Sequence, residues 1–221
     1  MTTDKAAKLQ HTLALELIRI GAVTFSPEKP FTWASGIRSP VYCDNRLTMS
    51  YPEIRRLITD GFQEALRSTH IEPDTVVGTA TAGIPHAAWL ADRLNLPMAY
   101  VRSSTKAHGR ENRIEGVVEA GTEAVVVEDL ISTGRSSLEA VTAVREASAS
   151  VHLVLAIFSY GLPAAAGAFE AAGVDLISLT SFSHLTRIAQ SQGLLEPDVV
   201  GRLEMWHSEL DETMRQTGGS P

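Results

Sequence analysis

The sequence predicts an α/β protein in which helices flank a central, mostly parallel sheet. Short apolar segments alternate with helical segments through residues 51–179, a pattern typical of a parallel sheet covered on both faces. Apolar residues make up 44% of the 221-residue chain and charged residues 20%, as in a soluble domain that buries a core. This length fits one full-sized domain with a modest appendage.

Three parts are expected along the chain. Residues 1–50 are predicted to form an N-terminal helix and a flap, residues 51–195 the core, and residues 196–221 a terminal helix and tail. The first helix is defined by apolar residues at helical spacing, namely Leu9, Leu13, Leu17 and Ile20. After it, prolines and a glycine between aromatic residues predict short strands and turns over residues 22–50.

Within the core, apolar runs and turn residues locate each element. The expected strands are residues 75–78, 98–101, 124–128, 151–158 and 174–179. The expected helices are residues 52–67, a turn-to-helix stretch ending near Leu94, about 135–147, about 163–172 and the terminal 196–216. Residues 103–116 are polar, charged and glycine-bearing without apolar periodicity, which predicts a long mobile loop.

The overall charge argues against nucleic acid as the main partner. The formal net charge is −7, whereas phosphate backbones select basic surfaces. The single cysteine, Cys43, cannot form an intramolecular disulfide and suits a reducing cytosol. No apolar run approaches the roughly 20 residues that cross a bilayer, and the first residues lack an apolar signal segment. A cytoplasmic protein that does not enter a membrane is therefore expected.

Two adjacent acids, Glu128 and Asp129, end the expected strand at residues 124–128. Charge beside a dry core is costly without a partner, and the vicinal hydroxyls of a ribose or a hydrated divalent cation would each be suitable. Small and hydroxylated residues then open a helix over residues 132–137, where backbone N–H groups and the helix dipole create an anion site. Together these features predict a site for a phosphorylated ribose. An N-capped helix after an acidic turn would leave the two acids unexplained.

Other phosphate-binding and metal-binding patterns do not fit this chain. A P-loop requires Gly-Lys-Ser/Thr, and a dinucleotide site requires Gly-x-Gly-x-x-Gly directly after a strand; the sequence contains neither. The histidines show none of the Cys/His/Asp spacings that are typical of a zinc site.

The segment from Val125 to Ser137 resembles the signature of the type I phosphoribosyltransferases, which use 5-phosphoribosyl 1-diphosphate. The resemblance implies that Glu128 and Asp129 hold the ribose of the donor. It further implies a cradle for the 5-phosphate that consists of Leu130, Ile131, Ser132, Thr133, Gly134, Arg135 and Ser136. Arg135 departs from the family pattern, in which a glycine or another small residue is common. The family's Mg²⁺ is held mainly by the substrate diphosphate, so no protein metal ligands are assigned.

Two further segments imply how the diphosphate is held. The turn with Thr81 and Ala82 fits the family's diphosphate-binding turn. Residues 100–116 resemble the loop of orotate phosphoribosyltransferase, in which an arginine, a lysine and a histidine contact the diphosphate across a homodimer interface. The matching positions in this chain are Arg102, Lys106 and His108.

The flap segment, residues 31–46, also resembles orotate phosphoribosyltransferase, where it covers the base. Tyr42 and Cys43 occupy base-contacting positions, and Ser132 matches a hydroxyl residue that contacts orotate. Three positions that carry cations in many members are neutral here, which indicates a subtype of the family. These positions are Ala34, Ala82 and Ser103.

The resemblance therefore implies transfer of ribosyl 5-phosphate from 5-phosphoribosyl 1-diphosphate to orotate. The products would be orotidine 5′-phosphate and diphosphate, in the biosynthesis of UMP. Lys106 and Asp129 are expected to be catalytic, Mg²⁺ is the expected cofactor, and a homodimer that shares the 103–116 loop is expected. Two alternatives stay open: a phosphoribosyltransferase for another base, and a nucleotide-sensing regulator with the same fold.

Overall fold

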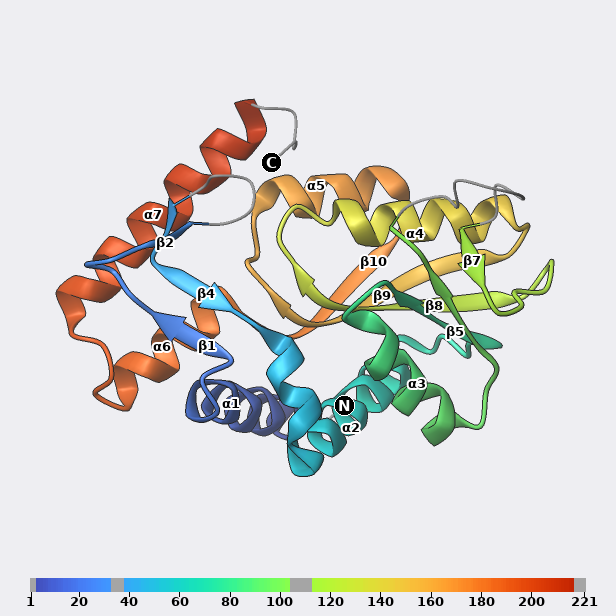
Figure 1. The fold of residues 1–221 in the computed structure, drawn as a ribbon, viewed down its shortest axis with the longest axis horizontal. Helices are drawn as coiled ribbons and strands as arrows, with labels where there is room; N and C mark the ends of the chain where they lie inside the picture. Colours follow the sequence, from blue (N-terminus) through green and yellow to red (C-terminus); the bar gives the residue numbers. More distant parts are fainter. Residues whose placement is uncertain (1–2, 33–37, 104–112, 217–221) are drawn as a thin grey trace.

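The computed structural model describes residues 3–32, 38–103 and 113–216 and has one central sheet between two layers of helices (Figure 1). Six strands form this sheet, in the order β10 (Asp175–Ser181), β9 (Ser150–Ser159), β8 (Glu123–Ile131), β5 (Thr75–Thr79), β6 (Met98–Val101) and β7 (Ile114–Glu115). All neighbouring strands are parallel except β6 and β7. The predicted α/β fold with a mostly parallel sheet is confirmed.

The strand order reverses between β5 and β8. From β5 the chain adds β6 and β7 on one side of the sheet, and it then returns to place β8, β9 and β10 on the other. The two strands pair in parallel, with Gly78 opposite Val127. Sheets of this kind bind ligands beyond the carboxyl ends of the strands at such a reversal. The residues that follow Thr79, and those around Glu128, therefore lie at the expected binding position.

Two groups of helices cover the two faces of the sheet (Figure 1). One face carries α4 (Arg135–Glu146) and α5 (Pro163–Ala172). The other face carries α1 (Thr3–Arg19), α2 (Pro52–Thr69) and α3 (Gly83–Leu94). This sandwich of helices leaves the carboxyl ends of the strands as the open edge of the sheet.

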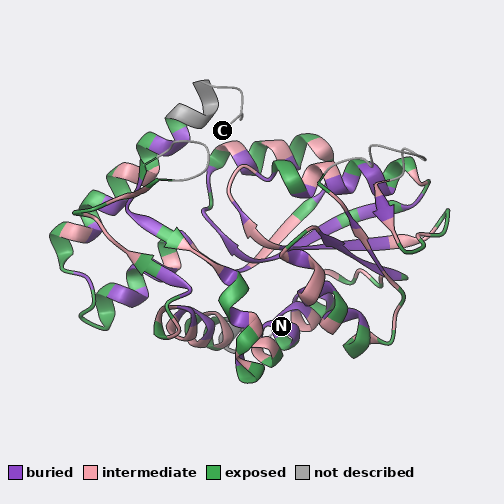
Figure 2. Cartoon of the chain, in the orientation of Figure 1, coloured by how far each residue is buried: buried purple, intermediate pink, exposed green. Residues whose placement is uncertain are grey.

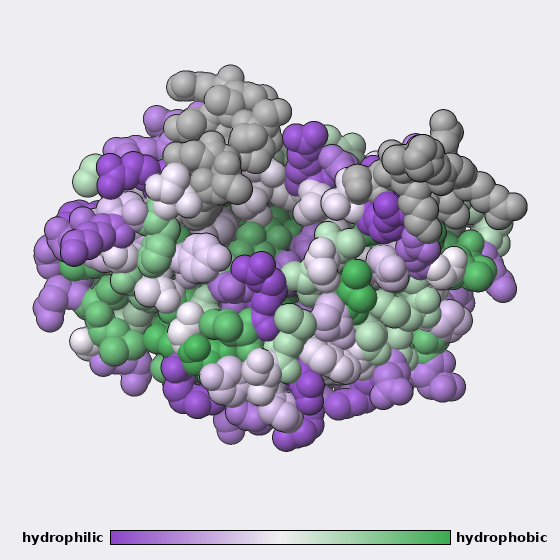
Figure 3. Space-filling model, viewed as in Figure 1, coloured by the Kyte–Doolittle hydropathy of each residue, from purple (hydrophilic) through white to green (hydrophobic). Residues whose placement is uncertain are grey.

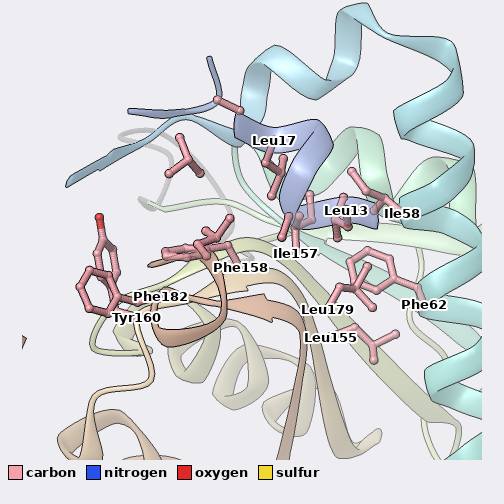
Figure 4. Close-up of a cluster of buried hydrophobic side chains, with 14 of the residues drawn as sticks. Leu13, Leu17, Ile58, Phe62, Leu155, Ile157, Phe158, Tyr160, Leu179 and Phe182 are labelled. Carbon is pink, nitrogen blue, oxygen red and sulfur yellow. The ribbon is translucent and has the colours of Figure 1, made fainter. Parts of the chain in front are cut away.

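The sheet buries side chains on both of its faces (Figure 2). Val125 and Val127 of β8 join a cluster with α1 and α2, whereas Val126 between them joins a second cluster beneath α4. Figure 4 shows part of the first cluster, in which Phe62 of α2 lies over the face of the sheet that carries Leu179 and Leu155. Because both faces of each central strand are covered, the strands read as continuous apolar runs in the sequence.

The N-terminal flap lies beside the end of β8 (Figure 1). Its described residues form the strands β1 (Val23–Phe25), β2 (Phe31–Thr32), β3 (Arg38–Ser39) and β4 (Val41–Cys43) and the 3₁₀ helix η1 (Asn45–Ser50). β1 pairs with β4 and β2 pairs with β3, both antiparallel. The prediction of short strands and turns in this region is confirmed.

Two strands differ from the sequence prediction. β8 continues past residue 128, because Leu130 and Ile131 pair with Phe158 and Ser159 of β9. The acidic pair therefore lies within a strand and not at its end. β7 occupies part of the expected 103–116 loop, where Ile114 pairs with Val101.

Two helices complete the chain. α6 (Phe182–Ser191) is absent from the prediction, because it begins directly after β10 without a loop to mark its start. Ser181 caps it, accepting a hydrogen bond from the backbone N–H of His184 at 3.4 Å. α7 (Pro197–Gln216) matches the expected terminal helix. Among the described residues, no helix has both the length and the apolar composition needed to cross a membrane.

Candidate active site

Glu128 lies within β8, and only 5% of the residue is exposed. One carboxylate oxygen accepts hydrogen bonds from Ser136 Oγ at 3.0 Å and Ser137 Oγ at 3.2 Å. The other oxygen accepts from the backbone N–H of Asp129 at 3.1 Å. Burial raises the pKa of Glu128 well above its ordinary value, and the charge of Asp129 raises it further. This carboxylate therefore connects β8 to the first turn of α4.

The carboxyl group of Asp129 follows directly in the chain and lies within reach of the Glu128 carboxyl group. The backbone carbonyl oxygen of Asp129 accepts a hydrogen bond from Nδ2 of Asn45 at 2.7 Å. Asn45 is fully buried, and its Oδ1 lies 3.5 Å from the thiol of Cys43. Burial raises the pKa of Asp129 as well, while the charge of Arg46 lowers it. Hence the Glu128 side chain contacts α4, and the Asp129 backbone contacts the flap.

A pocket of about 300 Å³ opens between the end of β8 and the start of α4. Its lining residues are Leu130, Ser132, Thr133, Gly134, Arg135, Ser136 and Glu139. Gly134 has a φ of 78°, and a Cβ there would lie 2.5 Å from Cε2 of Phe169, so this position requires glycine. As the N-cap, Gly134 has no side chain to occupy the first N–H groups of α4. The pocket gathers most of the predicted phosphate cradle, whereas Ile131 is fully buried in the core.

An ion-pair network borders this pocket. Glu139 accepts a hydrogen bond from Nε of Arg135 at 3.0 Å and another from a terminal nitrogen of Arg113 at 3.0 Å. The bond from Arg113 is the largest cause of a lowered pKa at Glu139. Two guanidinium groups against one carboxylate leave a net positive charge at the rim. Arg135, the departure from the family pattern, is thus held in place by its own helix.

The turn after β5 lies next to β8. Thr81 is exposed and Ala82 is half-buried, so both can meet a ligand at the carboxyl end of the sheet. At Gly83 a Cβ would lie 2.4 Å from the carbonyl oxygen of Val127. Glycine at this position lets the start of α3 approach the backbone of β8 closely. The predicted diphosphate turn and the acidic pair are therefore neighbours.

Arg102 stands at the end of β6, where the segment that carries the predicted diphosphate residues begins. Its backbone N–H donates to the carbonyl oxygen of Arg113 at 2.9 Å, and its guanidinium lies 3.5 Å from the Glu115 carboxylate. The other two predicted residues of this segment, Lys106 and His108, lie outside the described residues. The structure therefore locates only the two ends of the predicted loop.

Tyr42 and Cys43 lie on β4 of the flap. Tyr42 is 39% exposed, and its ring centroid lies 5.4 Å from that of Phe31. Cys43 is half-buried, and burial raises the pKa of its thiol, so the thiol stays protonated. Around β1 and β4, hydrophobic residues reach the surface that Figure 3 presents, while hydrophilic residues follow the lower edge of the molecule. The predicted contact of Tyr42 and Cys43 with a base stays a prediction.

Sequence reasoning missed Asn45 and Arg113. Asn45 follows an apolar strand directly after Asp44, and a polar residue there reads as an ordinary turn. Arg113 lies within the charged segment that was expected to be one loop. The contacts of both residues are made far along the chain, so the local pattern gives no signal for them.

Comparison with known proteins identifies the family. The phosphoribosyl transferase domain matches residues 49–163. An orotate phosphoribosyltransferase of Bacillus pumilus is 52% identical over 198 residues, which covers 89% of this chain and 93% of that protein. The orotate phosphoribosyltransferase of Bacillus subtilis is 50% identical over 198 residues, covering 90% of this chain and 92% of that protein.

Solved structures agree with these matches. The orotate phosphoribosyltransferase of Aeropyrum pernix superposes with a TM-score of 0.72 at 31% identity and covers 83% of this chain and 99% of that one. The Mycobacterium tuberculosis enzyme in complex with 5-phospho-α-D-ribosyl 1-diphosphate gives a TM-score of 0.63 at 25% identity, covering 80% and 98%. The predicted type I phosphoribosyltransferase fold is confirmed. With its acidic pair and the pocket at the start of α4 beside the reversal of strand order, the chain belongs to the orotate phosphoribosyltransferase family.

Proposed function

We propose that the chain transfers the ribosyl 5-phosphate group of 5-phosphoribosyl 1-diphosphate to orotate, giving orotidine 5′-phosphate and diphosphate. The observation that carries the proposal is the pocket at the start of α4, adjacent to Glu128 and Asp129. Relatives named for this activity, at about half identity over most of the chain, support orotate as the acceptor. The reaction belongs to the synthesis of UMP, and the reduced single cysteine suits the cytoplasm.

The 5-phosphate binds in the pocket between β8 and α4. Helix N-termini bind phosphate through free N–H groups and the positive end of the helix dipole. Thr133 lines the same pocket, and its hydroxyl can donate to phosphate oxygens. Ser136 Oγ instead donates to Glu128, so its part in the cradle is its backbone N–H.

The ribose lies against Asp129. Both oxygens of Glu128 already accept hydrogen bonds within the protein, so Asp129 is the member of the acidic pair that is assigned to the sugar hydroxyls. Glu128 acts indirectly, because its bonds to Ser136 and Ser137 fix the cradle relative to β8. When the C1–O bond breaks, positive charge develops on the ribosyl ring, and a fixed carboxylate nearby stabilises it.

The diphosphate lies between the turn at Thr81 and Ala82 and the cations that follow β6. Arg102, Lys106 and His108 neutralise the charge that grows on the leaving group. A loop that closes over the site excludes water, which would otherwise consume the activated ribosyl centre. In the proposed homodimer this loop is supplied by the neighbouring subunit. Lys106 has its main effect in the transition state, which makes it the proposed catalytic cation.

Orotate binds between the flap and the end of β8. The backbone of Tyr42 and Cys43 meets the pyrimidine edge, and Ser132 offers a hydroxyl from the opposite side. Burial raises the pKa of the Cys43 thiol, which disfavours the nucleophilic thiolate, so no covalent role is assigned to it. Orotate carries an acidic imide, so the site needs no strong general base.

Mg²⁺ takes oxygen ligands and combines substrate phosphates and water with one or two carboxylates. The ion would be held mainly by the diphosphate of the donor, and Asp129 would be the nearest carboxylate that could add to it. When bound, the ion neutralises part of the diphosphate charge. The protein residues then need to balance only the remainder.

A spectrophotometric assay tests the proposal. Protein, 5-phosphoribosyl 1-diphosphate, Mg²⁺ and orotate are mixed, and the ultraviolet absorbance of orotate is followed. Loss of that absorbance, slowed strongly by Asp129→Asn, is the expected result. If the folded protein leaves orotate unchanged but consumes the donor when a purine base is added, the acceptor is a purine and not orotate. Nucleotide binding without turnover of any base would point to a regulator.

A further inference from the structure

The C-terminal helix α7 contacts both sides of the proposed acceptor site. Nε1 of Trp206 donates a hydrogen bond to the carbonyl oxygen of Arg38 in flap strand β3 at 2.9 Å. The next residue, His207, places Nε2 at 2.6 Å from the carbonyl oxygen of Tyr160, which follows β9. A carbonyl oxygen can only accept, so Nε2 of His207 carries the proton. Adjacent residues of one helix therefore donate to the flap and to the end of the sheet.

Both donors are held by a cluster of aromatic rings. The His207 ring stacks on Phe182 with centroids 4.7 Å apart and an interplanar angle of 8°. The Trp206 ring lies 5.9 Å from Phe182 and 6.3 Å from Tyr160. Figure 4 shows Phe182 and Tyr160 side by side at the edge of the hydrophobic core. Rings packed in this way fix the directions of the two N–H donors.

α7 is also attached on either side of this cluster. Leu203 and Leu210 are buried in the main core, at 0% and 4% exposure. Asp211 accepts a hydrogen bond from the backbone N–H of Ala164 at 3.1 Å, in the first turn of α5. Near the other end of α7, Arg202 forms a 2.8 Å ion pair with Glu28 of the flap. The helix is therefore a fixed support and not a loose appendage.

The carbonyl groups of Arg38 and Tyr160 are each linked by a short path to a residue that is proposed to contact orotate. On the flap, Ser39 follows Arg38, and its buried hydroxyl accepts from the backbone N–H of Val41 at 3.1 Å, next to Tyr42. On the sheet, the backbone N–H of Tyr160 donates to Ile131 at 2.9 Å, next to Ser132. A shift of either carbonyl would displace one wall of the acceptor site relative to the other.

We propose that Trp206 and His207 are positioning residues that set the spacing between the flap and the end of β9, and thereby the affinity for orotate. The inference rests on the proposed function, and it assigns these two residues to the orotate side of the site. Neither residue lines the pocket between β8 and α4. Their loss should therefore leave binding of the phosphoribosyl donor unchanged.

Conservative variants of the full chain test this. Trp206→Phe keeps a ring but loses the N–H donor, and His207→Phe keeps the stack on Phe182 but loses its donor. His207→Gln keeps an N–H donor, so it should restore most of the affinity for orotate that His207→Phe loses. Met205→Ala is the matched control, because Met205 is exposed on the same helix turn. For each variant, KM for orotate, KM for the donor, kcat and thermal stability are measured.

The expected result is a rise of about five-fold in KM for orotate in Trp206→Phe and in His207→Phe. A change of this size corresponds to the loss of about one hydrogen bond. KM for the donor should stay within about two-fold, as it should in Met205→Ala. An unchanged KM for orotate overturns the proposal. An equal rise in both KM values together with lower thermal stability overturns it too, because that pattern marks a purely structural role. Wild-type protein that does not use orotate would refute the proposed function instead.

Discussion

Asn45 of the flap donates a hydrogen bond from Nδ2 to the backbone carbonyl oxygen of Asp129, at 2.7 Å. The two residues are 84 positions apart in the chain, and Asn45 is fully buried. The bond joins the flap to the strand that carries the proposed ribose-binding carboxylate. Because the bond is direct, a displacement of Asn45 should also displace the backbone of Asp129.

Asn45→Ala should lower both stability and turnover. The variant leaves a buried carbonyl oxygen without its donor, which costs about 1–3 kcal/mol of unfolding free energy. Urea denaturation measures this loss, and the orotate assay should give a lower kcat. Asn45→Asp is the sharper comparison, because a carboxylate has the same shape but cannot donate and adds charge beside Asp129. Equal stability of Asn45→Asp and the wild type would contradict the role given to this bond.

Glu128→Gln should flatten the dependence of stability on pH. The folded state raises the pKa of Glu128, so its stabilising contribution is complete below the ordinary value of 4.5 and is lost as the pH rises through the folded value. The free energy of unfolding of the wild type should therefore fall between about pH 5 and about pH 9, and it should fall less in the variant. Glu119→Gln, at an exposed residue, should follow the wild type. Identical slopes for Glu128→Gln and wild type would show that burial does not control this carboxylate.

Gly134→Ala should destabilise the protein more than the same change at Gly121. Both glycines have positive φ, 78° and 80°, and alanine in that conformation costs about 1–2 kcal/mol. Only at Gly134 would the new Cβ meet another group, Phe169 at 2.5 Å, whereas nothing lies within 4 Å at Gly121. Chemical denaturation of both variants separates the clash from the backbone strain. Phe169→Leu combined with Gly134→Ala should recover part of the difference, and a lack of recovery would place the cost elsewhere.

Arg135→Ser should raise KM for the phosphoribosyl donor by about three- to ten-fold and weaken its dependence on salt. A cation in the first turn opposes the helix dipole, and its pairing with Glu139 across an exposed surface contributes little stability. An anionic ligand in the adjacent pocket explains its position. Steady-state kinetics at low and high salt measure the effect. Arg67→Ser, which removes an exposed cation of α2, is the control, and equal behaviour of the two variants would refute the assignment.

Lys106→Ala should cut kcat strongly while KM for the donor stays within about two-fold, because the cation acts on charge that develops during bond breaking. Lys8→Ala on α1 controls for loss of a positive charge. Loss of donor binding in Lys106→Ala would mean that the loop anchors the ground state.

Mixing two inactive variants tests whether the loop is shared. In a dimer of one Lys106→Ala subunit and one Asp129→Asn subunit, a loop supplied by the neighbour restores one complete site. Activity should therefore return after the two proteins are mixed and allowed to exchange subunits. If exchange is demonstrated and no activity returns, the loop serves its own subunit.

The alternation of strands and helices was predictable, because each element has its own apolar period and turn residues. That Ser132 to Ser136 line one pocket was predictable too, since these residues are adjacent in sequence, while phosphate as its ligand stays a prediction. The bonds from Ser136 and Ser137 to Glu128 were not predictable, because neighbouring acids look equivalent until α4 is known to lie beside β8. Contacts such as Asn45 to Asp129 join distant segments and depend on the completed fold.

The bond between Trp206 and Arg38 has a consequence for synthesis of the protein. The two residues are 168 positions apart, so the flap leaves the ribosome long before its support exists. At about 5–20 residues per second, the delay is roughly 10 to 30 s. The strands and helices that form the proposed donor pocket are made during this interval, whereas the proposed orotate side lacks the bonds from Trp206 and His207 until α7 is made. A nascent chain arrested within α7 would therefore have the residues of both sides but not the fixed distance between them.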